Sequence, residues 1–165
     1  EAILPNPTLL IVGAGHVGKA VAHLAKWLDF RGVIAEDKPE FCTPEHIPGG
    51  DEYLPVAMDE ITKHLQINAQ TFIVMATRGA DVDAIALPDL LESDAAYIGV
   101  IGSKRRWLEA SKLTIERGVD EEQLKRVHSP IGLEIEAETP EEIAISIMAE
   151  VLMIRHGGTG EQMTI

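Results

Sequence analysis

A glycine-rich turn is the feature that most constrains how this chain can fold. The segment Gly13-Ala14-Gly15-His16-Val17-Gly18 directly follows a β-rich run, Thr8–Val12, and opens a stretch whose apolar residues recur at helical spacing. In such a turn Gly13 permits a sharp reversal, Gly15 lets the backbone approach a pyrophosphate, and Gly18 lets the helix pack close to the strand. Because the pattern lies between a predicted strand and a predicted helix, it indicates a dinucleotide-binding turn rather than a packing turn alone.

An acidic pair supports the same interpretation. Glu36 ends the next β-rich run, Gly32–Glu36, and Asp37 directly follows it. A carboxylate at this place can accept hydrogen bonds from ribose hydroxyls and repels a 2'-phosphate, so NAD or another adenosine group is favoured over NADP. The start of the first helix would attract the ligand's phosphates. His16 can face such a phosphate or solvent. The expected cofactor-binding residues here are Gly13, Gly15, His16, Val17, Gly18, Glu36 and Asp37.

Short β-rich runs alternate with helical patterns along the rest of the chain, which is typical of βαβ units. Further strands are predicted around Tyr53, over 71–76 and 95–101, and beginning at Val127 and His128. Helices are predicted over about 17–28, 59–65, 81–91 and 103–117, followed by a shorter helix that opens at Asp120 and a last helix that opens at Thr139. The helix over 81–91 is expected to break or restart at Pro88, which lacks the interior N–H donor. The predicted fold class is α/β: a Rossmann-like, doubly wound, mostly parallel sheet flanked by helices.

One domain is expected from 165 residues. Residues 1–7 are interpreted as a linker or the tail of a preceding region, 8–156 as a Rossmann-like nucleotide-binding domain, and 157–165 as a flexible C-terminal tail. The chain begins with Glu1 and a Pro-Asn-Pro stretch, so we expect it to be the C-terminal part of a longer protein. The wide apolar stripe of the last helix would be buried against the sheet or a second copy, as in a homodimer.

Polar and basic residues follow several predicted strands, where a doubly wound sheet binds its ligand. They are Thr77-Arg78-Gly79, then Ser103-Lys104-Arg105-Arg106, and finally His128. The cations of the second group open a helix, where the helix dipole disfavours positive charge. An anion such as phosphate or a pterin phosphate would explain them, and a solvated surface helix is the alternative. Thr77, Arg78, Gly79, Ser103, Lys104 and Arg105 are therefore added to the cofactor-binding candidates.

Composition excludes several classes of function. Acidic residues outnumber basic ones by 27 to 14, and the net charge of -13 argues against nucleic acid or an anionic membrane as partner. No apolar run approaches the roughly 18 residues that span a bilayer. A single cysteine, Cys42, forms no intrachain disulfide, and without a secretory signal the cytoplasm is the expected location. No metal-ligand spacing occurs, no residue is assigned as catalytic, and the roles of Cys42 and His128 stay open.

Several ordered blocks of the sequence resemble the XdhC/CoxI accessory proteins of xanthine dehydrogenase and related molybdenum hydroxylases, specifically their C-terminal Rossmann-like domain. The resemblance extends through nearly the whole chain. It rests on residues 12–18, Glu36 to Phe41, Ala76 to Gly79, Ala96 to Arg105, and His128 to Ile135 with Ala137 to Ala144. A glycine-rich turn is common to many families, whereas this ordered set of later blocks is specific.

The resemblance implies a role in maturation: binding molybdenum cofactor (molybdopterin), protecting it during sulfuration and delivering it to an apo molybdenum hydroxylase. Its implied partners are that hydroxylase and the cofactor-sulfurating enzyme. The residues of this chain match only the family's C-terminal domain, so we expect them to lack the part that the family's usual N-terminal domain would contribute. Two other classes stay open from the residues themselves. One is an NAD-dependent oxidoreductase, which would need a substrate domain and a proton-transfer residue, and the other is a nucleotide-sensing regulatory domain.

Overall fold

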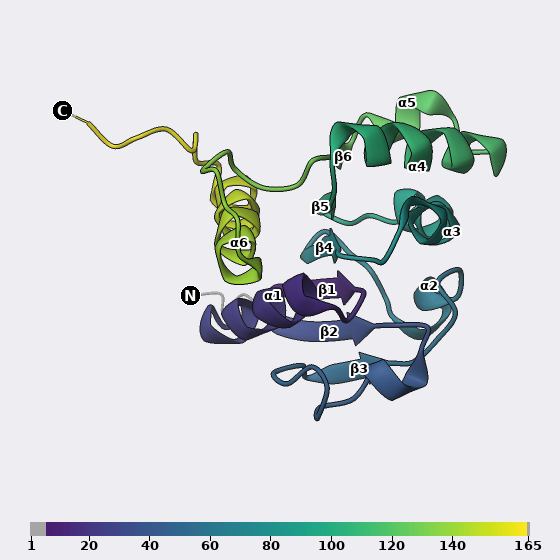
Figure 1. Cartoon of the computed structure of the whole chain (residues 1–165), viewed down its shortest axis with the longest axis horizontal. Helices are drawn as coiled ribbons and strands as arrows, with labels where there is room; N and C mark the ends of the chain where they lie inside the picture. The colour runs from purple at the N-terminus through teal and green to yellow at the C-terminus, as the bar shows by residue number, and fades with distance from the viewer. Residues whose placement is uncertain (1–5, 165) are drawn as a thin grey trace.

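A six-stranded, all-parallel sheet forms the centre of the computed structural model, which describes residues 6–164 (Figure 1). The strand order is β3-β2-β1-β4-β5-β6, so the chain winds outward in both directions from the pair β1 and β4. The strands are β1 (Thr8–Val12), β2 (Arg31–Ala35), β3 (Glu52–Leu54), β4 (Thr71–Met75), β5 (Tyr97–Val100) and β6 (Val127–His128). This confirms the expected Rossmann-like α/β class. Each predicted strand is present, and the four strands with predicted bounds end within two residues of them.

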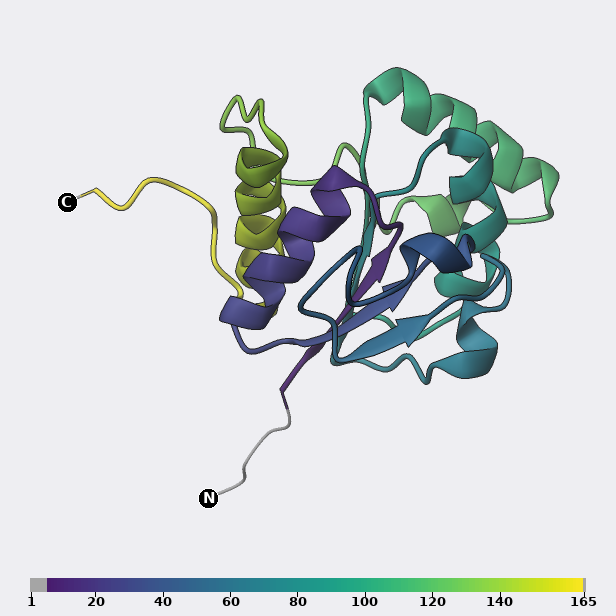
Figure 2. The same cartoon turned by 60° about the horizontal axis from the view of Figure 1, so that its bottom comes forward.

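Helices cover both faces of this sheet (Figures 1 and 2). One face carries α1 (His16–Trp27) and α6 (Pro140–His156), which pack side by side. The other carries α2 (Ile61–His64), α3 (Ala80–Leu91), α4 (Lys104–Glu116) and α5 (Glu121–Leu124), and a short 3-10 turn, η1 (Pro39–Phe41), follows β2. Of the helices within residues 6–164, none is both long and apolar enough to cross a membrane.

Alternating side chains along the strands build two cores, one on each face. In β1, Leu9 and Ile11 belong to the core under α1 and α6, whereas Leu10 and Val12 belong to the core under α3. Successive strand residues point to opposite faces, and a parallel sheet with both faces covered needs apolar residues at nearly every position. The apolar stripe of α6, which includes Ile147, is buried within the chain itself.

The predicted helix starts are confirmed for three helices, but the helix break predicted at Pro88 does not occur. Ser103 caps α4, and capping boxes open α5 at Asp120 and α6 at Thr139, as predicted. The expected break at Pro88 is wrong, because α3 runs without interruption from Ala80 to Leu91. Three leucines around it, Leu87, Leu90 and Leu91, are buried. At roughly 2 kcal/mol each, their burial outweighs the roughly 3 kcal/mol cost of an interior proline.

The domain limits expected near the two ends of the chain stay predictions. Residues 1–5 of the expected linker lie outside the described residues, and Asn6 and Pro7 lead directly into β1. After α6 the stretch 157–164 has no regular secondary structure.

Candidate functional site

Two of the three motif glycines are required by packing within the chain. Gly13 has a φ of +109°, and a Cβ added there would lie 2.2 Å from the carbonyl oxygen of Ala76, at the end of β4. A Cβ at Gly18 would lie 2.7 Å from the carbonyl oxygen of Gly13. Any side chain at either position would therefore push the turn away from its neighbours, and the fold alone explains both glycines.

Gly15 differs from these two glycines. Its φ of -85° suits any residue, and a Cβ added there would find no heavy atom within 4 Å. Gly15 is the N-cap of α1, and within residues 6–164 no side chain caps this helix. The first turn of a helix leaves N–H groups without intrahelical partners and carries partial positive charge. The turn thus presents donors beside a space that the chain does not fill.

A cavity of about 320 Å³ lies next to this turn. It is formed where β1, β2 and β4 end, which is the ligand crevice of an open parallel sheet. Its walls come from the glycine turn, from the segment after β2 and from the residues that follow β4. The lining residues are Gly13, Ala14, Gly15, Glu36, Lys38, Phe41, His46, Met58, Ala76, Thr77 and Arg78.

The acidic pair after β2 divides its contacts between this turn and an arginine. The buried carboxylate of Glu36 accepts hydrogen bonds from the N–H of Ala14 at 3.3 Å and the N–H of Lys38 at 2.9 Å. Burial, with the neighbouring Asp37 carboxyl, raises the pKa of Glu36. Asp37 accepts two hydrogen bonds from the guanidinium of Arg78, at 2.8 and 3.0 Å, which lower its pKa to about 2. The Asp37–Arg78 pair therefore links the segment after β2 to the segment after β4.

Phe41 and His46 line the cavity but were not among the residues expected from sequence. His46 Nε2 lies 2.8 Å from the carbonyl oxygen of Ala14, and its ring centroid is 4.9 Å from that of Phe41. Both come from the irregular stretch between β2 and β3, where no periodicity guides a prediction. The only sequence signal was indirect, since Phe41 ends one of the blocks that carry the family resemblance.

One of the three cations at the start of α4 turns inward. Arg106 Nη2 donates to the carbonyl and hydroxyl oxygens of Thr77, at 3.0 and 2.9 Å. The same guanidinium contacts Asp83, a fully buried carboxylate on α3 that also accepts a hydrogen bond from the Thr77 hydroxyl. The anion that explains Arg106 thus belongs to the chain itself, and the contact fixes Thr77 in the cavity wall.

The remaining candidates lie away from the cavity. Ser103 accepts the N–H of Arg106 at 3.2 Å as helix cap, and Arg105 is exposed. Lys104 lines a separate hollow of about 750 Å³ between Gly102 and the loop 130–137. Val17 belongs to α1 and packs against the core under that helix, and Gly79 is the N-cap of α3. His16 lines a groove on the outer face of α1 instead of the cavity. The structure therefore gathers Gly13, Gly15, Glu36, Thr77 and Arg78, with Asp37 bound to Arg78.

These features define a Rossmann-like domain with a glycine-rich turn at its central crevice. The family model described as "XdhC Rossmann domain" matches residues 9–151. The chain therefore belongs to the XdhC family, in agreement with the resemblance in its sequence blocks.

Longer proteins share this domain. The chain is 35% identical over 159 residues to "Uncharacterized protein YqeB" of Escherichia coli, covering 96% of this chain and 29% of that protein. It is 29% identical over 155 residues to a probable xanthine dehydrogenase subunit of Bacillus subtilis, covering 94% and 45%. The crystal structure of a xanthine dehydrogenase from Bacillus halodurans superposes with a TM-score of 0.79 at 31% identity, covering 94% and 44%. The chain thus spans less than half of each.

Proposed function

We propose that this chain is the nucleotide- or molybdenum-cofactor-binding domain of an accessory protein that serves a molybdenum hydroxylase of the xanthine dehydrogenase type and assists cofactor insertion. Family membership and the names of two relatives support the association with xanthine dehydrogenase. The observation that carries the binding proposal is the open space at Gly15, which no side chain of the described residues fills.

The chemistry of the cavity suits a phosphate joined to a flat heterocycle, which NAD, other dinucleotides and molybdopterin share. Unpaired N–H groups at the start of α1 would hold the phosphate. The rings of Phe41 and His46 would contact the heterocycle. A cavity of about 320 Å³ lies at the small end of the range for ligand pockets. It therefore suits one nucleotide of a dinucleotide, or the pterin part of molybdopterin. Molybdenum cofactor, when bound, supplies the redox-active metal that the hydroxylase requires.

Glu36 and Asp37 would determine which nucleotide is accepted. Arg78, the nearest guanidinium, is already paired with Asp37. Lys38 also lines the cavity, and its ammonium lies over the Phe41 ring. A 2'-phosphate would therefore meet two carboxylates beside this one cation, whereas ribose hydroxyls could donate to the carboxylates. We expect NAD or AMP to bind more tightly than NADP.

Titration calorimetry with NAD, NADP, AMP and molybdopterin tests the binding proposal through Gly15→Ala. The added Cβ would meet no heavy atom within 4 Å beyond its chain neighbours. It would take up part of the space beside the start of α1, where we place the phosphate. We expect an unchanged fold and at least a tenfold loss of affinity. Gly158→Ala is the matched control, because its Cβ also meets nothing closer than 3.8 Å and it lies after α6. The proposal fails if wild-type protein binds none of the four ligands, or if both variants bind like wild type.

The accessory role predicts partners as well as a ligand. An apo molybdenum hydroxylase and a cofactor-sulfurating enzyme are the proposed partners, and a homodimer is proposed as the assembled state. Apo-hydroxylase mixed with free cofactor and the full-length protein should recover more hydroxylase activity than apo-hydroxylase mixed with free cofactor alone. Equal recovery would contradict the accessory role but not ligand binding.

A further inference from the structure

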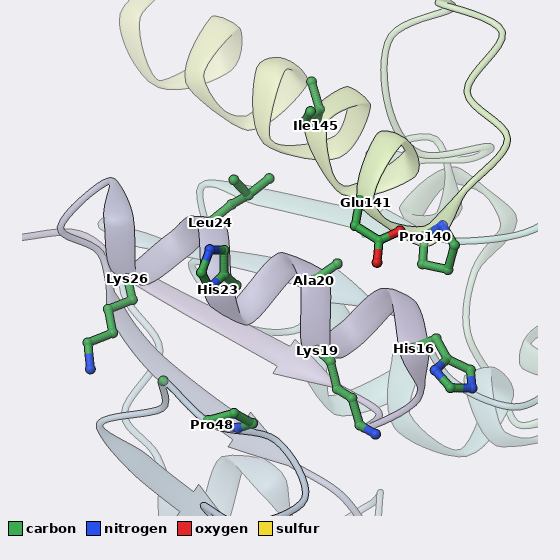
Figure 3. Close-up of a pocket in the computed structure, with 11 residues that line it drawn as sticks. His16, Lys19, Ala20, His23, Leu24, Lys26, Pro48, Pro140, Glu141 and Ile145 are labelled. Carbon is green, nitrogen blue, oxygen red and sulfur yellow. The ribbon is translucent and has the colours of Figure 1, made fainter.

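A groove of about 600 Å³ runs along the outward face of α1, apart from the cavity at the glycine turn (Figure 3). The floor is α1 itself, with Ala20 in the middle. The turn at Pro48 borders one side, and the start of α6, with Glu141 and Ile145, borders the other (Figure 3). Along the helix it extends from His16 to Lys26, which is about 15 Å or nearly three helical turns.

The charge of this groove is opposite to that of the molecule. The chain has a net charge of -13, yet α1 contains no aspartate or glutamate. Lys19 and Lys26 stand on the side of Pro48 (Figure 3). The ion pairs formed within residues 6–164 include neither lysine. His16 and His23 lie along the same helix. The lysines thus form a positive edge without internal counter-charge.

The opposite side of the groove is apolar. Leu24 lies on the side of α6, and Ile145 of α6 is 54% exposed (Figure 3). Trp27 continues the outward face of α1 one turn beyond His23 and is 77% exposed. Exposed tryptophan is rare on a free surface and common at the centre of protein interfaces. Among the described residues that line the groove, Glu141 is the one carboxylate, and it also lies on the α6 side, away from the lysines.

We propose that this groove docks an acidic amphipathic helix of a partner protein. The apolar stripe of that helix would lie on Ala20, Leu24 and Ile145, and its carboxylates would lie along Lys19 and Lys26. A helix in a groove is recognised through apolar anchors at three- and four-residue spacing. With its carboxylates on the lysine side, the docked helix would also keep them away from Glu141. These two requirements would fix how the docked helix is rotated about its own axis.

Selection from a displayed library of helical peptides of about 14 residues, long enough to fill the groove, tests this docking site. We expect the enriched peptides to carry leucine, isoleucine or phenylalanine on one face and aspartate or glutamate along one flank. A synthetic copy of the most enriched peptide should shift the emission of Trp27. The shift should persist in Trp107→Phe and disappear in Trp27→Phe.

Charge reversal on two helices provides the matched comparison. Lys19→Glu/Lys26→Glu should weaken binding of that peptide at least tenfold, because it removes the positive edge. Lys112→Glu/Arg117→Glu makes the same change in charge at exposed positions in and directly after α4, and should leave affinity within twofold of wild type. Ala20→Arg should abolish binding by filling the floor of the groove.

Several outcomes would overturn the proposal. They are an enriched set without acidic bias, equal losses in the two charge-reversed variants, or wild-type affinity in Ala20→Arg. Self-association in sedimentation that Ala20→Arg abolishes would assign the groove to a second copy. Lysine-dependent binding to phosphatidylserine vesicles without peptide binding would assign it to a membrane surface. Gly15→Ala should leave peptide binding unchanged, so this proposal and the nucleotide proposal can fail separately.

Discussion

The guanidinium of Arg106 contacts the buried carboxylate of Asp83 through two nitrogens, at 3.2 and 3.1 Å. Asp83 has no exposed side-chain surface, and Arg106 keeps only 23% of its own. The pair joins α4 to α3, and through Thr77 it also joins both helices to the wall of the cavity.

We expect Arg106→Ala to lower the free energy of unfolding by about 3 kcal/mol, because it leaves a carboxylate buried without its cation. Arg105→Ala is the matched control: Arg105 is the neighbouring, exposed arginine, and its loss should change stability by less than about 0.5 kcal/mol. Urea unfolding at pH 7 measures both. Burial raises the pKa of Asp83, so the penalty should shrink at low pH as this carboxyl takes up a proton. Equal effects of the two variants would contradict the structural role of Arg106.

The Asp37–Arg78 pair predicts a pH dependence at the edge of the cavity. Arg78 lowers the pKa of Asp37 from 3.8 to about 2. A lowered folded-state pKa adds stability above the unfolded-state value, and this contribution is lost as the pH falls from about 4 towards 2. Because Arg78 is 46% exposed, solvent screening limits the contribution to about 1 kcal/mol or less.

Carboxyl NMR titration of Asp37 measures this coupling directly. Arg78→Gln should return the pKa of Asp37 towards 3.8. Lys125→Gln, which removes a cation from an exposed pair with Glu122, should not move it. A pKa of Asp37 that stays near its wild-type value in Arg78→Gln would show that the guanidinium is not the cause.

Pro88 in the interior of α3 offers a stabilising substitution. Alanine there restores one N–H donor inside the helix and removes the proline ring from the preceding turn. The gain is reduced because the unfolded chain also becomes more flexible. We expect Pro88→Ala to raise the free energy of unfolding by roughly 1 to 2 kcal/mol. Thermal unfolding measures the change, and a variant less stable than wild type would show that the proline ring packs favourably.

Most of the fold could be predicted from sequence because its signals are local. β1 and β4 each contain four consecutive apolar residues, and β5 has the β-rich sequence Tyr-Ile-Gly-Val. The helix α6 begins with Thr139, Pro140 and Glu142 at the N-cap, first and third positions. Pro88 was misjudged for the opposite reason. Its effect depends on how much leucine surface α3 buries against the rest of the fold. That burial is set by tertiary packing, which the residues around Pro88 do not reveal by themselves.

The site could be predicted only in part. Gly13, Gly15 and Glu36 belong to a motif in which spacing fixes geometry, so the sequence placed them together. No motif indicates which of three adjacent cations points inward, because Lys104, Arg105 and Arg106 differ only by the 100° turn between successive helix positions. His46 was missed since it lies in an irregular loop, and only the folded chain brings it to Ala14.

A buried hydrogen bond between Tyr97 and Glu150 ties α6 to β5. The Tyr97 hydroxyl donates to Glu150 Oε1 at 2.6 Å, and burial together with this carboxylate strongly raises the pKa of Tyr97. Tyr97→Phe would leave a buried carboxylate without its donor, so we expect a loss of roughly 1 to 3 kcal/mol in urea unfolding. Glu150→Gln keeps an acceptor for the hydroxyl without the charge and should cost less. Wild-type stability in Tyr97→Phe would mean that Glu150 finds another partner, and His128 Nδ1 lies 3.7 Å from Glu150 Oε1.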